Sequence, residues 1–467
     1  MKRRDYMEDT SHQRRFLPYA LAAFAIGIVG GFSTVLGPAF VEDLGLPYDC
    51  TTWTALAQAM STAACAPILG KVGDRLGRRP TLLWGLGIFT LGNLLSALAG
   101  SLGFMLLARF VVGLGTAAMA PVILGFILAE FPADQVGRSF SQYMLISSGA
   151  VVFGPTIGGL FLAGPGWRAM LWVCTLLSAT IGVLCWILSR GQAPSSRPRE
   201  AFDGVGAGLI LVFFSLALCL PAFAQTFGLS SGIFWGTFAA FAISGVGLVT
   251  AERRAKNPIL SGKFLGKPRF FLSILALFLT QGLMQANMTN AMVFLRYVNP
   301  ESALSSGLTV SVLYLGMSLG AVVLGPMADR HPPKGVLALA LVLTALGCGG
   351  LLGVTAGAPT WALMVPLGIL GLGLGGVGTI FLKVALSGLA PEESGAASGT
   401  FGLFRDLSAP FGVAVLVPLF TRRVTAAQAL GLPAPQAAAQ ALHTLAWVEL
   451  GCIAGAALAV CLIPRKA

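Results

Sequence analysis

Gly70-Lys71-Val72-Gly73-Asp74-Arg75 decides the fold, because it recurs later in the chain as Gly325-Pro326-Met327-Ala328-Asp329-Arg330. The first glycine, the aspartate and the arginine keep their places in both copies, which lie 255 residues apart. The same offset carries an apolar run near 16–39 onto 271–294, and it carries Pro155 onto Pro410. Three coincidences at one offset indicate two homologous halves.

The composition around these repeats is that of a membrane protein. Of the 467 residues, 56% are hydrophobic and 10% are charged, whereas soluble domains carry about 25% charged residues. A bilayer core of about 30 Å needs roughly 20 apolar residues per helix. Fourteen runs meet this length, near 16–39, 52–70, 81–100, 103–128, 140–163, 168–189, 205–225, 231–250, 270–295, 305–326, 335–356, 361–386, 397–420 and 442–463. The sequence therefore predicts an all-α integral membrane protein with 14 spans.

The repeat and the runs together predict how the chain is organised. Residues 1–189 and 270–467 form two six-helix pseudo-repeat bundles, and residues 190–269 form a linker and two inserted transmembrane helices. Parallel repeats of this kind are typical of transporters, whose substrate site lies at the midplane between the halves.

The net charge of +12 is a matter of topology. With a cytoplasmic N-terminus, 23 of the 30 Lys and Arg residues fall on cytoplasmic segments and four on outer loops. We therefore expect a multi-pass protein of the cell membrane (inner or plasma membrane) with both termini in the cytoplasm, and no nucleic-acid partner. The eight cysteines are scattered within apolar runs, which predicts no metal site and no cofactor.

Three motifs carry a family resemblance. Residues 70–79 resemble motif A of the major facilitator superfamily, with Gly70, Gly73, Asp74, Arg75, Gly77, Arg78 and Arg79. Residues 109–115 resemble motif B, with Val112 in the place of the usual Gln. Residues 149–159 resemble motif C, the antiporter signature, with Gly149, Gly154, Pro155, Gly158 and Gly159. The number of spans is similar to that of the fourteen-helix drug:proton antiporter branch.

The resemblance implies roles for these motifs. Motif A would act as a gate, with Asp74 near the N-terminus of the helix that begins near Pro391, where the helix dipole favours a carboxylate. The alternative is that its charges only fix topology. Motif C would be a rocker element, since Pro155 removes a backbone donor and bends the helix; simple tight packing is the alternative.

Charged residues within spans are candidates for proton coupling. Arg109 matches the motif B arginine, which the family links to coupling, and Asp406 falls near the middle of its span. A structural ion pair is the alternative for Asp406. We expect Glu449 to be structural and Lys383 to snorkel toward the membrane surface.

One stripe on the run 270–295 is a candidate substrate surface, formed by Gln281, Gln285, Met288 and Met292. Amides and pliable thioethers suit bulky amphiphiles of varied shape. Interhelical packing with polar contacts is the alternative.

These observations predict a secondary active transporter that exports hydrophobic or amphiphilic small molecules by alternating access, coupled to protons. The alternative is proton-coupled uptake or export of an organic anion. It is favoured by the missing acid in residues 28–36 and by Arg109, Lys383 and Arg405 within spans. We expect no enzymatic activity, because the GxGxxG match at 371–376 and the GxSxG match at 228–232 lack the strand context that those motifs require.

Overall fold

The computed structural model describes residues 2–46, 50–130, 136–190, 204–228, 230–254, 262–298, 303–387 and 391–464. Some side chains within these ranges lie outside the description: those of 2–15 and 391–396, and those of Asp74, Arg75, Glu130, Arg138 and Asp406 among others. The regular structure of the described residues is entirely helical, as the composition predicts.

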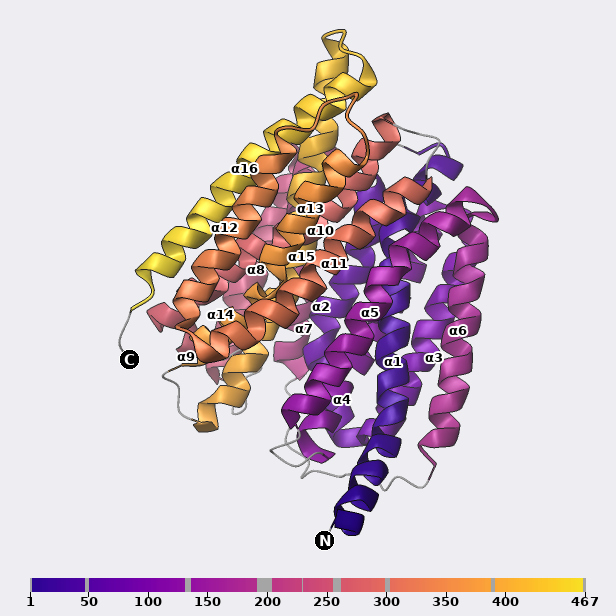
Figure 1. The fold of residues 1–467 in the computed structure, drawn as a ribbon, viewed down its shortest axis with the longest axis vertical. Coiled ribbons are helices and arrows are strands. Elements are labelled where there is room, and N and C mark those ends of the chain that lie inside the picture. Colours follow the sequence, from indigo (N-terminus) through magenta and orange to yellow (C-terminus); the bar gives the residue numbers. More distant parts are fainter. Residues whose placement is uncertain are drawn as a thin grey trace.

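Sixteen helices follow one another in the described part of the chain (Figure 1). They are α1 (Lys2–Asp43), α2 (Cys50–Leu76), α3 (Arg78–Ala97), α4 (Leu102–Glu130), α5 (Val136–Ala163), α6 (Gly166–Leu188), α7 (Gly204–Thr226), α8 (Gly232–Arg254), α9 (Gly262–Leu265), α10 (Pro268–Val298), α11 (Ala303–Arg330), α12 (Pro333–Leu351), α13 (Trp361–Gly375), α14 (Val377–Leu386), α15 (Pro391–Ala429) and α16 (Ala434–Leu462).

The fold has many spans. Within the described residues, eleven stretches are long and apolar enough to cross a bilayer, and two shorter apolar helices cover Gly149–Ala163 and Gly208–Pro221. The predicted run 361–386 is one of the eleven, although Gly376 divides it into α13 and α14. The prediction of an all-helical membrane protein is confirmed, and this chain is a multi-pass membrane protein.

The helices pack as two bundles with matching internal contacts. In the N-terminal bundle (α1–α6), α1 packs on α5, α2 on α4, and α3 on α6. In the C-terminal bundle (α10–α16), α10 packs on α15, α11 on α13, and α12 on α16. An offset of 255 residues carries α1 to α5 onto α10, α11, α12, α13–α14 and α15, so the first two pairs match the repeat. The same offset would start α6 at residue 421, whereas α16 begins at Ala434, so the third pair matches in the order of the helices only. The bundles meet along two seams, α5 against α11 and α2 against α15.

Helices α7 and α8 lie outside the two bundles. Helix α7 contacts both α2 and α15, while α8 packs on α7. The ring centroids of Phe214 on α7 and Phe404 on α15 lie 6.5 Å apart. Those of Phe223 on α7 and Trp53 on α2 lie 5.4 Å apart. The inserted pair therefore covers the α2–α15 seam from outside.

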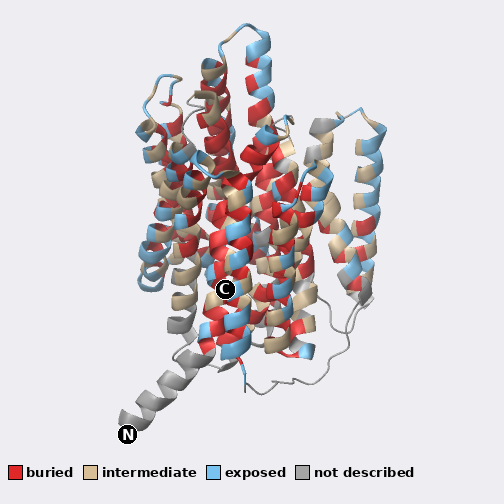
Figure 2. Ribbon diagram, turned by 90° about the vertical axis from the view of Figure 1, so that its right-hand side faces the viewer, coloured by how far each residue is buried: buried red, intermediate tan, exposed pale blue. Residues whose placement is uncertain are grey.

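Figure 2 shows the buried residues on the helix faces that meet one another and the exposed residues on the outward faces, and many of the exposed residues are large and apolar. Trp84, Leu176 and Ile243 are 70%, 65% and 72% exposed. Large apolar patches of this kind are rare on soluble proteins, but they match a lipid environment, where the helical backbone satisfies its own hydrogen bonds.

Candidate functional site

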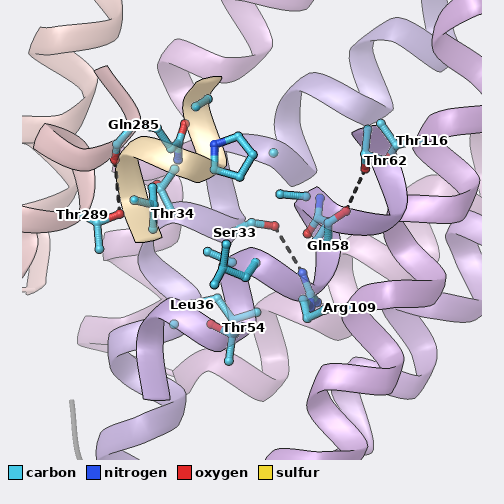
Figure 3. A pocket seen from close by; sticks show the side chains of 18 of the residues that line it. Ser33, Thr34, Leu36, Thr54, Gln58, Thr62, Arg109, Thr116, Gln285 and Thr289 are labelled. Atoms are coloured by element: carbon cyan, nitrogen blue, oxygen red, sulfur yellow. Dashed lines mark hydrogen bonds between the residues drawn. The ribbon is translucent and has the colours of Figure 1, made fainter. Parts of the chain in front are cut away.

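A central cavity of about 520 Å³ lies between the two bundles (Figure 3). Helices α1, α2, α4 and α5 line it from the N-terminal bundle, and α10, α11 and α15 line it from the C-terminal bundle. Its polar lining consists of Ser33, Thr34, Thr51, Thr54, Gln58, Thr62, Arg109, Thr116, Ser147, Gln281, Gln285, Thr289, Tyr314 and Arg405. Among the described lining residues there is no Asp or Glu.

Arg109 lies deep in the N-terminal bundle and reaches the cavity wall. Its side chain is 2% exposed; Nε donates to Ser96 Oγ at 3.2 Å and Nη1 donates to Ser33 Oγ at 3.2 Å. Figure 3 shows the Ser33 and Arg109 side chains pointing toward each other. Nη2 has no hydrogen-bond partner among the described residues, and no described carboxylate forms an ion pair with Arg109. A buried cation with donors to spare attracts anionic or acceptor-rich groups.

The motif B glycine lets α4 approach α2 beside the cavity. A Cβ at Gly113 would overlap Ser61 Oγ and the carbonyl oxygen of Gln58, so a side chain there would push the helices apart. Thr62 Oγ1, one residue after Ser61, donates to the Gly113 carbonyl at 3.2 Å and to the Gln58 carbonyl at 2.9 Å. The glycine therefore positions the polar face of α2 next to Arg109.

On α10, the structure separates the predicted stripe into two parts. Gln281 and Gln285 line the cavity, together with Met284 and Thr289. Figure 3 shows Gln285 and Thr289 among the lining side chains. Met288 and Met292 are buried in the core and do not line the cavity. Both methionines form part of the buried apolar core instead.

Motif C on α5 is clamped between α1 and α11. A Cβ at Gly154 would lie 2.6 Å from the Gly31 Cα, and one at Gly158 would lie 2.5 Å from Val35 of α1. Pro155 and Gly159 are buried, whereas a Cβ at Gly149 would meet nothing within 4 Å. Gly154 and Gly158 therefore allow α5 to pack closely on α1, whereas Gly149 has open space beside it.

The opposite face of α5 seals the seam with α11. Ser311 Oγ donates to the Val152 carbonyl at 2.7 Å and lies 2.7 Å from Thr156 Oγ1. Gly307 faces the backbone of Pro155, where a Cβ would overlap the carbonyl oxygen. Pro155 of motif C and Gly307 of α11 therefore meet at this point.

An ion pair joins the two bundles on the far side, which we define as the side where α1 ends. Arg296 Nη1 lies 2.5 Å from Glu42 Oε2, linking the ends of α10 and α1. Asp43, the next residue, instead pairs with Arg168 at 2.8 Å within the N-terminal bundle. Glu42–Arg296 is a contact that the sequence analysis missed, although both residues lie at the outer ends of predicted spans.

Motif A occupies the end of α2, a one-residue turn and the start of α3. Gly77 forms the turn with a φ of +94°, a conformation that favours glycine. Arg78 is buried, and Arg79 Nε donates to Ser189 Oγ at 3.0 Å. Gly70 and Gly73 face Pro121 and Val122 of α4. The Asp74 and Arg75 side chains lie outside the described structure, so the predicted gate stays a prediction.

The second copy of the motif contains an ion pair. Lys383 Nζ on α14 lies 2.6 Å from Asp329 Oδ1 and donates to the Ala328 carbonyl at 2.8 Å. Lys383 thus pairs with Asp329, the repeat partner of Asp74, which the expectation of snorkelling alone did not include. The repeat marks Asp329, but the position equivalent to Lys383 in the first half is Leu128, so the repeat does not indicate the pair. Asp406, the other predicted coupling residue, has a side chain outside the described structure.

Two helical bundles around a cavity that both of them line define a secondary-transporter architecture. The family model of the Major Facilitator Superfamily matches residues 19–413, and the chain belongs to this superfamily. It is therefore a transporter rather than an enzyme, as the sequence predicts.

Relatives and solved structures agree with this assignment. The chain is 26% identical over 410 residues to the Multidrug resistance protein B homolog of Mycobacterium tuberculosis (82% of this chain, 71% of the relative). It is 22% identical over 415 residues to Multidrug resistance protein 3 of Bacillus subtilis (88% and 80%). A crystal structure of an auto-inhibited POT family peptide transporter has a TM-score of 0.71 at 15% identity, covering 98% of this chain and 97% of that one.

Proposed function

We propose that this transporter exports hydrophobic or amphiphilic small molecules by alternating access, driven by protons. The observation that carries the proposal is the cavity between the bundles, which combines small, apolar and amide side chains, while the Glu42–Arg296 ion pair joins the bundles on the far side. A site of this kind accommodates varied apolar shapes and adds only a few directional contacts. The two relatives named above are multidrug resistance proteins by name, which supports the same class of substrate.

The proposal includes the organisation inferred from the sequence. We infer fourteen spans, with a six-helix bundle up to residue 189, an inserted pair of helices in 190–269, and a second bundle from 270 to the end. Both termini are cytoplasmic, because the basic residues gather on that side. Asp74 acts in the gate on the cytoplasmic side, and Arg109 and Asp406 take part in coupling transport to protons.

A second candidate, transport of an organic anion, is favoured by the charge of the cavity. Arg109 and Arg405 are the charged residues among the described lining, and Arg109 keeps an unpaired Nη2. In a low-dielectric site even a partly paired guanidinium favours a carboxylate or sulfonate over an ammonium group.

Transport by purified protein in proteoliposomes distinguishes the two candidates. A pH gradient is imposed, and the panel contains cationic, neutral and anionic amphiphiles of matched size. Gradient-driven accumulation of neutral or cationic members supports drug export, whereas accumulation of only the anionic members supports the second candidate. Arg405→Gln should then lower anion transport selectively. Accumulation of none of them, with folded protein, contradicts both.

A further inference from the structure

A second buried polar cluster lies away from the cavity, between α10, α12 and α16. Glu449 of α16 is fully buried. Its Oε1 accepts a hydrogen bond from Asn287 Nδ2 at 2.7 Å, and its Oε2 accepts one from the Cys348 thiol at 3.3 Å. No Lys, Arg or His forms an ion pair with Glu449 among the described residues.

Among the described side chains, the neighbouring helices bring no cation to this carboxyl. Helices α10, α12 and α15 pack against α16. Cys348 is the titratable group of α12 that faces Glu449, and Cys452 lies one turn along α16 itself. The remaining titratable or charged residues of these helices with described side chains lie at helix ends, on the cavity wall, or in other contacts: Arg269, Arg296, Tyr297, Lys334, Arg405, Arg422, Arg423, His443 and Cys461.

The surroundings of Glu449 act on its charge in opposite directions. Burial without a cation disfavours the carboxylate, because desolvation of the charge is not repaid by an ion pair. Two donors aimed at the two carboxyl oxygens favour the carboxylate, which can only accept. A group held between these two effects can change its protonation state when a neighbouring helix moves by a small distance.

That neighbouring helix is also the cavity wall. Asn287 lies two residues from Gln285 and two from Thr289, and successive residues of a helix are about 100° apart. Gln285 and Thr289 therefore face the cavity while Asn287 faces Glu449 on the other side of α10. Nine residues further on, the same helix carries Arg296, which holds the far-side ion pair with Glu42.

We propose that Glu449 is a reversible proton-binding site of the C-terminal bundle, and that Asn287 connects its protonation to the position of α10. In the charged state, Asn287 Nδ2 donates to both the Leu283 carbonyl, at 2.9 Å, and Glu449 Oε1. When the carboxylate takes up a proton from water, the new O–H needs an acceptor. The Asn287 Oδ1 provides it if the amide turns, and the amide then gives up the Leu283 carbonyl.

This inference rests on the proposed proton-driven transport, but its first test does not depend on a substrate. Infrared titration of the reconstituted protein between acid and alkaline pH follows the C=O band of protonated carboxyl groups. One component that appears on acidification should be absent from Glu449→Gln and present in the control Glu252→Gln, which changes a carboxyl of α8. Asn287→Ala should shift the titration of this component by about tenfold in proton affinity, a usual size for coupling between sites.

Transport supplies the second test. With the panel member that the wild type accumulates, Glu449→Gln should keep downhill exchange and lose at least about tenfold of the gradient-driven accumulation. An unchanged infrared titration, or full accumulation by a folded Glu449→Gln, overturns the inference. If Glu449→Gln does not fold, the infrared titration of Asn287→Ala decides alone: a shifted carboxyl component supports the inference, and an unshifted one overturns it. A wild type that titrates as described but accumulates no substrate contradicts the proposed function and leaves the proton site standing.

Discussion

At the scale of single residues, the described structure separates glycines that are required from glycines that only occur in a motif. Gly154 and Gly149 belong to the same motif and the same helix. Only Gly154 lies against the backbone of another helix, where a Cβ would lie 2.6 Å from the Gly31 Cα. The two positions therefore provide a matched pair.

We expect Gly154→Ala to destabilise the protein by about 1–3 kcal/mol, because an added methyl group forces α1 and α5 apart. Gly149→Ala meets nothing within 4 Å and should be neutral or stabilising by up to about 1 kcal/mol, since alanine favours the helix. Thermal unfolding of the purified variants in detergent checks both. Equal midpoints for the two would contradict the packing described for motif C.

The prediction for Asp406 rests on the sequence, because its side chain lies outside the described structure. Asp406→Asn mimics the protonated form at nearly constant volume. If Asp406 carries the coupled proton, the variant should keep downhill exchange of substrate and lose gradient-driven accumulation. If Asp406 has a structural ion pair instead, the loss of one partner costs about 3–5 kcal/mol, and the variant should melt early. Exchange, accumulation and thermal stability measured together separate the two roles.

At the scale of helices, α1 and α10 meet through the Glu42–Arg296 ion pair on the far side. Both side chains are partly exposed, so the pair stabilises the contact between the bundles on the far side by at most about 1 kcal/mol. This corresponds to roughly a fivefold change in the population of the state in which the bundles meet there. A fivefold change in this population is large enough to measure.

We expect Arg296→Gln to increase, by up to about fivefold, the rate at which an impermeant thiol reagent labels a cysteine at Ser306 from the far side. Ser306 is buried in a small pocket next to Arg296. Glu42→Gln should have the same effect, and the double variant no more than either one. Arg168→Gln is the control, because its ion pair with Asp43 stays within one bundle. An unchanged labelling rate in both Arg296→Gln and Glu42→Gln would show that this ion pair does not hold the bundles together.

The two copies of motif A make another comparison possible. Asp329 pairs with Lys383 inside the C-terminal bundle, so Asp329→Asn should reduce thermal stability slightly and leave transport largely intact. Asp74→Asn should abolish transport without loss of folded protein, if Asp74 acts in the gate between bundles. Transport by Asp74→Asn at the wild-type rate would contradict a gating role for Asp74.

At the scale of the whole molecule, the bundles and the inserted helices predict a topology that labelling can test. In a protein without its native cysteines, a new cysteine at Gln192 or Asn257 should react only from the cytoplasmic side. A cysteine at Leu430, which is exposed in the turn between α15 and α16, should react only from outside. Labelling of Gln192 or Asn257 from outside would contradict the arrangement of fourteen spans.

The sequence by itself determined the helical membrane fold, the repeat and the family. Those depend on local properties: an apolar run long enough for the bilayer, a glycine such as Gly77 at a turn, and a motif that recurs at a constant offset. The same local rules placed Arg109 within a span and Gln281 and Gln285 on the side of α10 that lines the cavity.

The tertiary structure alone decided which of these residues work together. Met288 shares a helical face with Gln285, yet it is buried in the apolar core and does not line the cavity. Glu449 looks like an isolated acid of a peripheral helix, yet it meets Asn287 and Cys348 from two other helices. Glu42 and Arg296 are far apart in the chain and form an ion pair only when the bundles meet. Periodicity fixes the face that a helix presents, but the tilt and separation of helices fix what that face contacts, and these arise from packing across the whole chain.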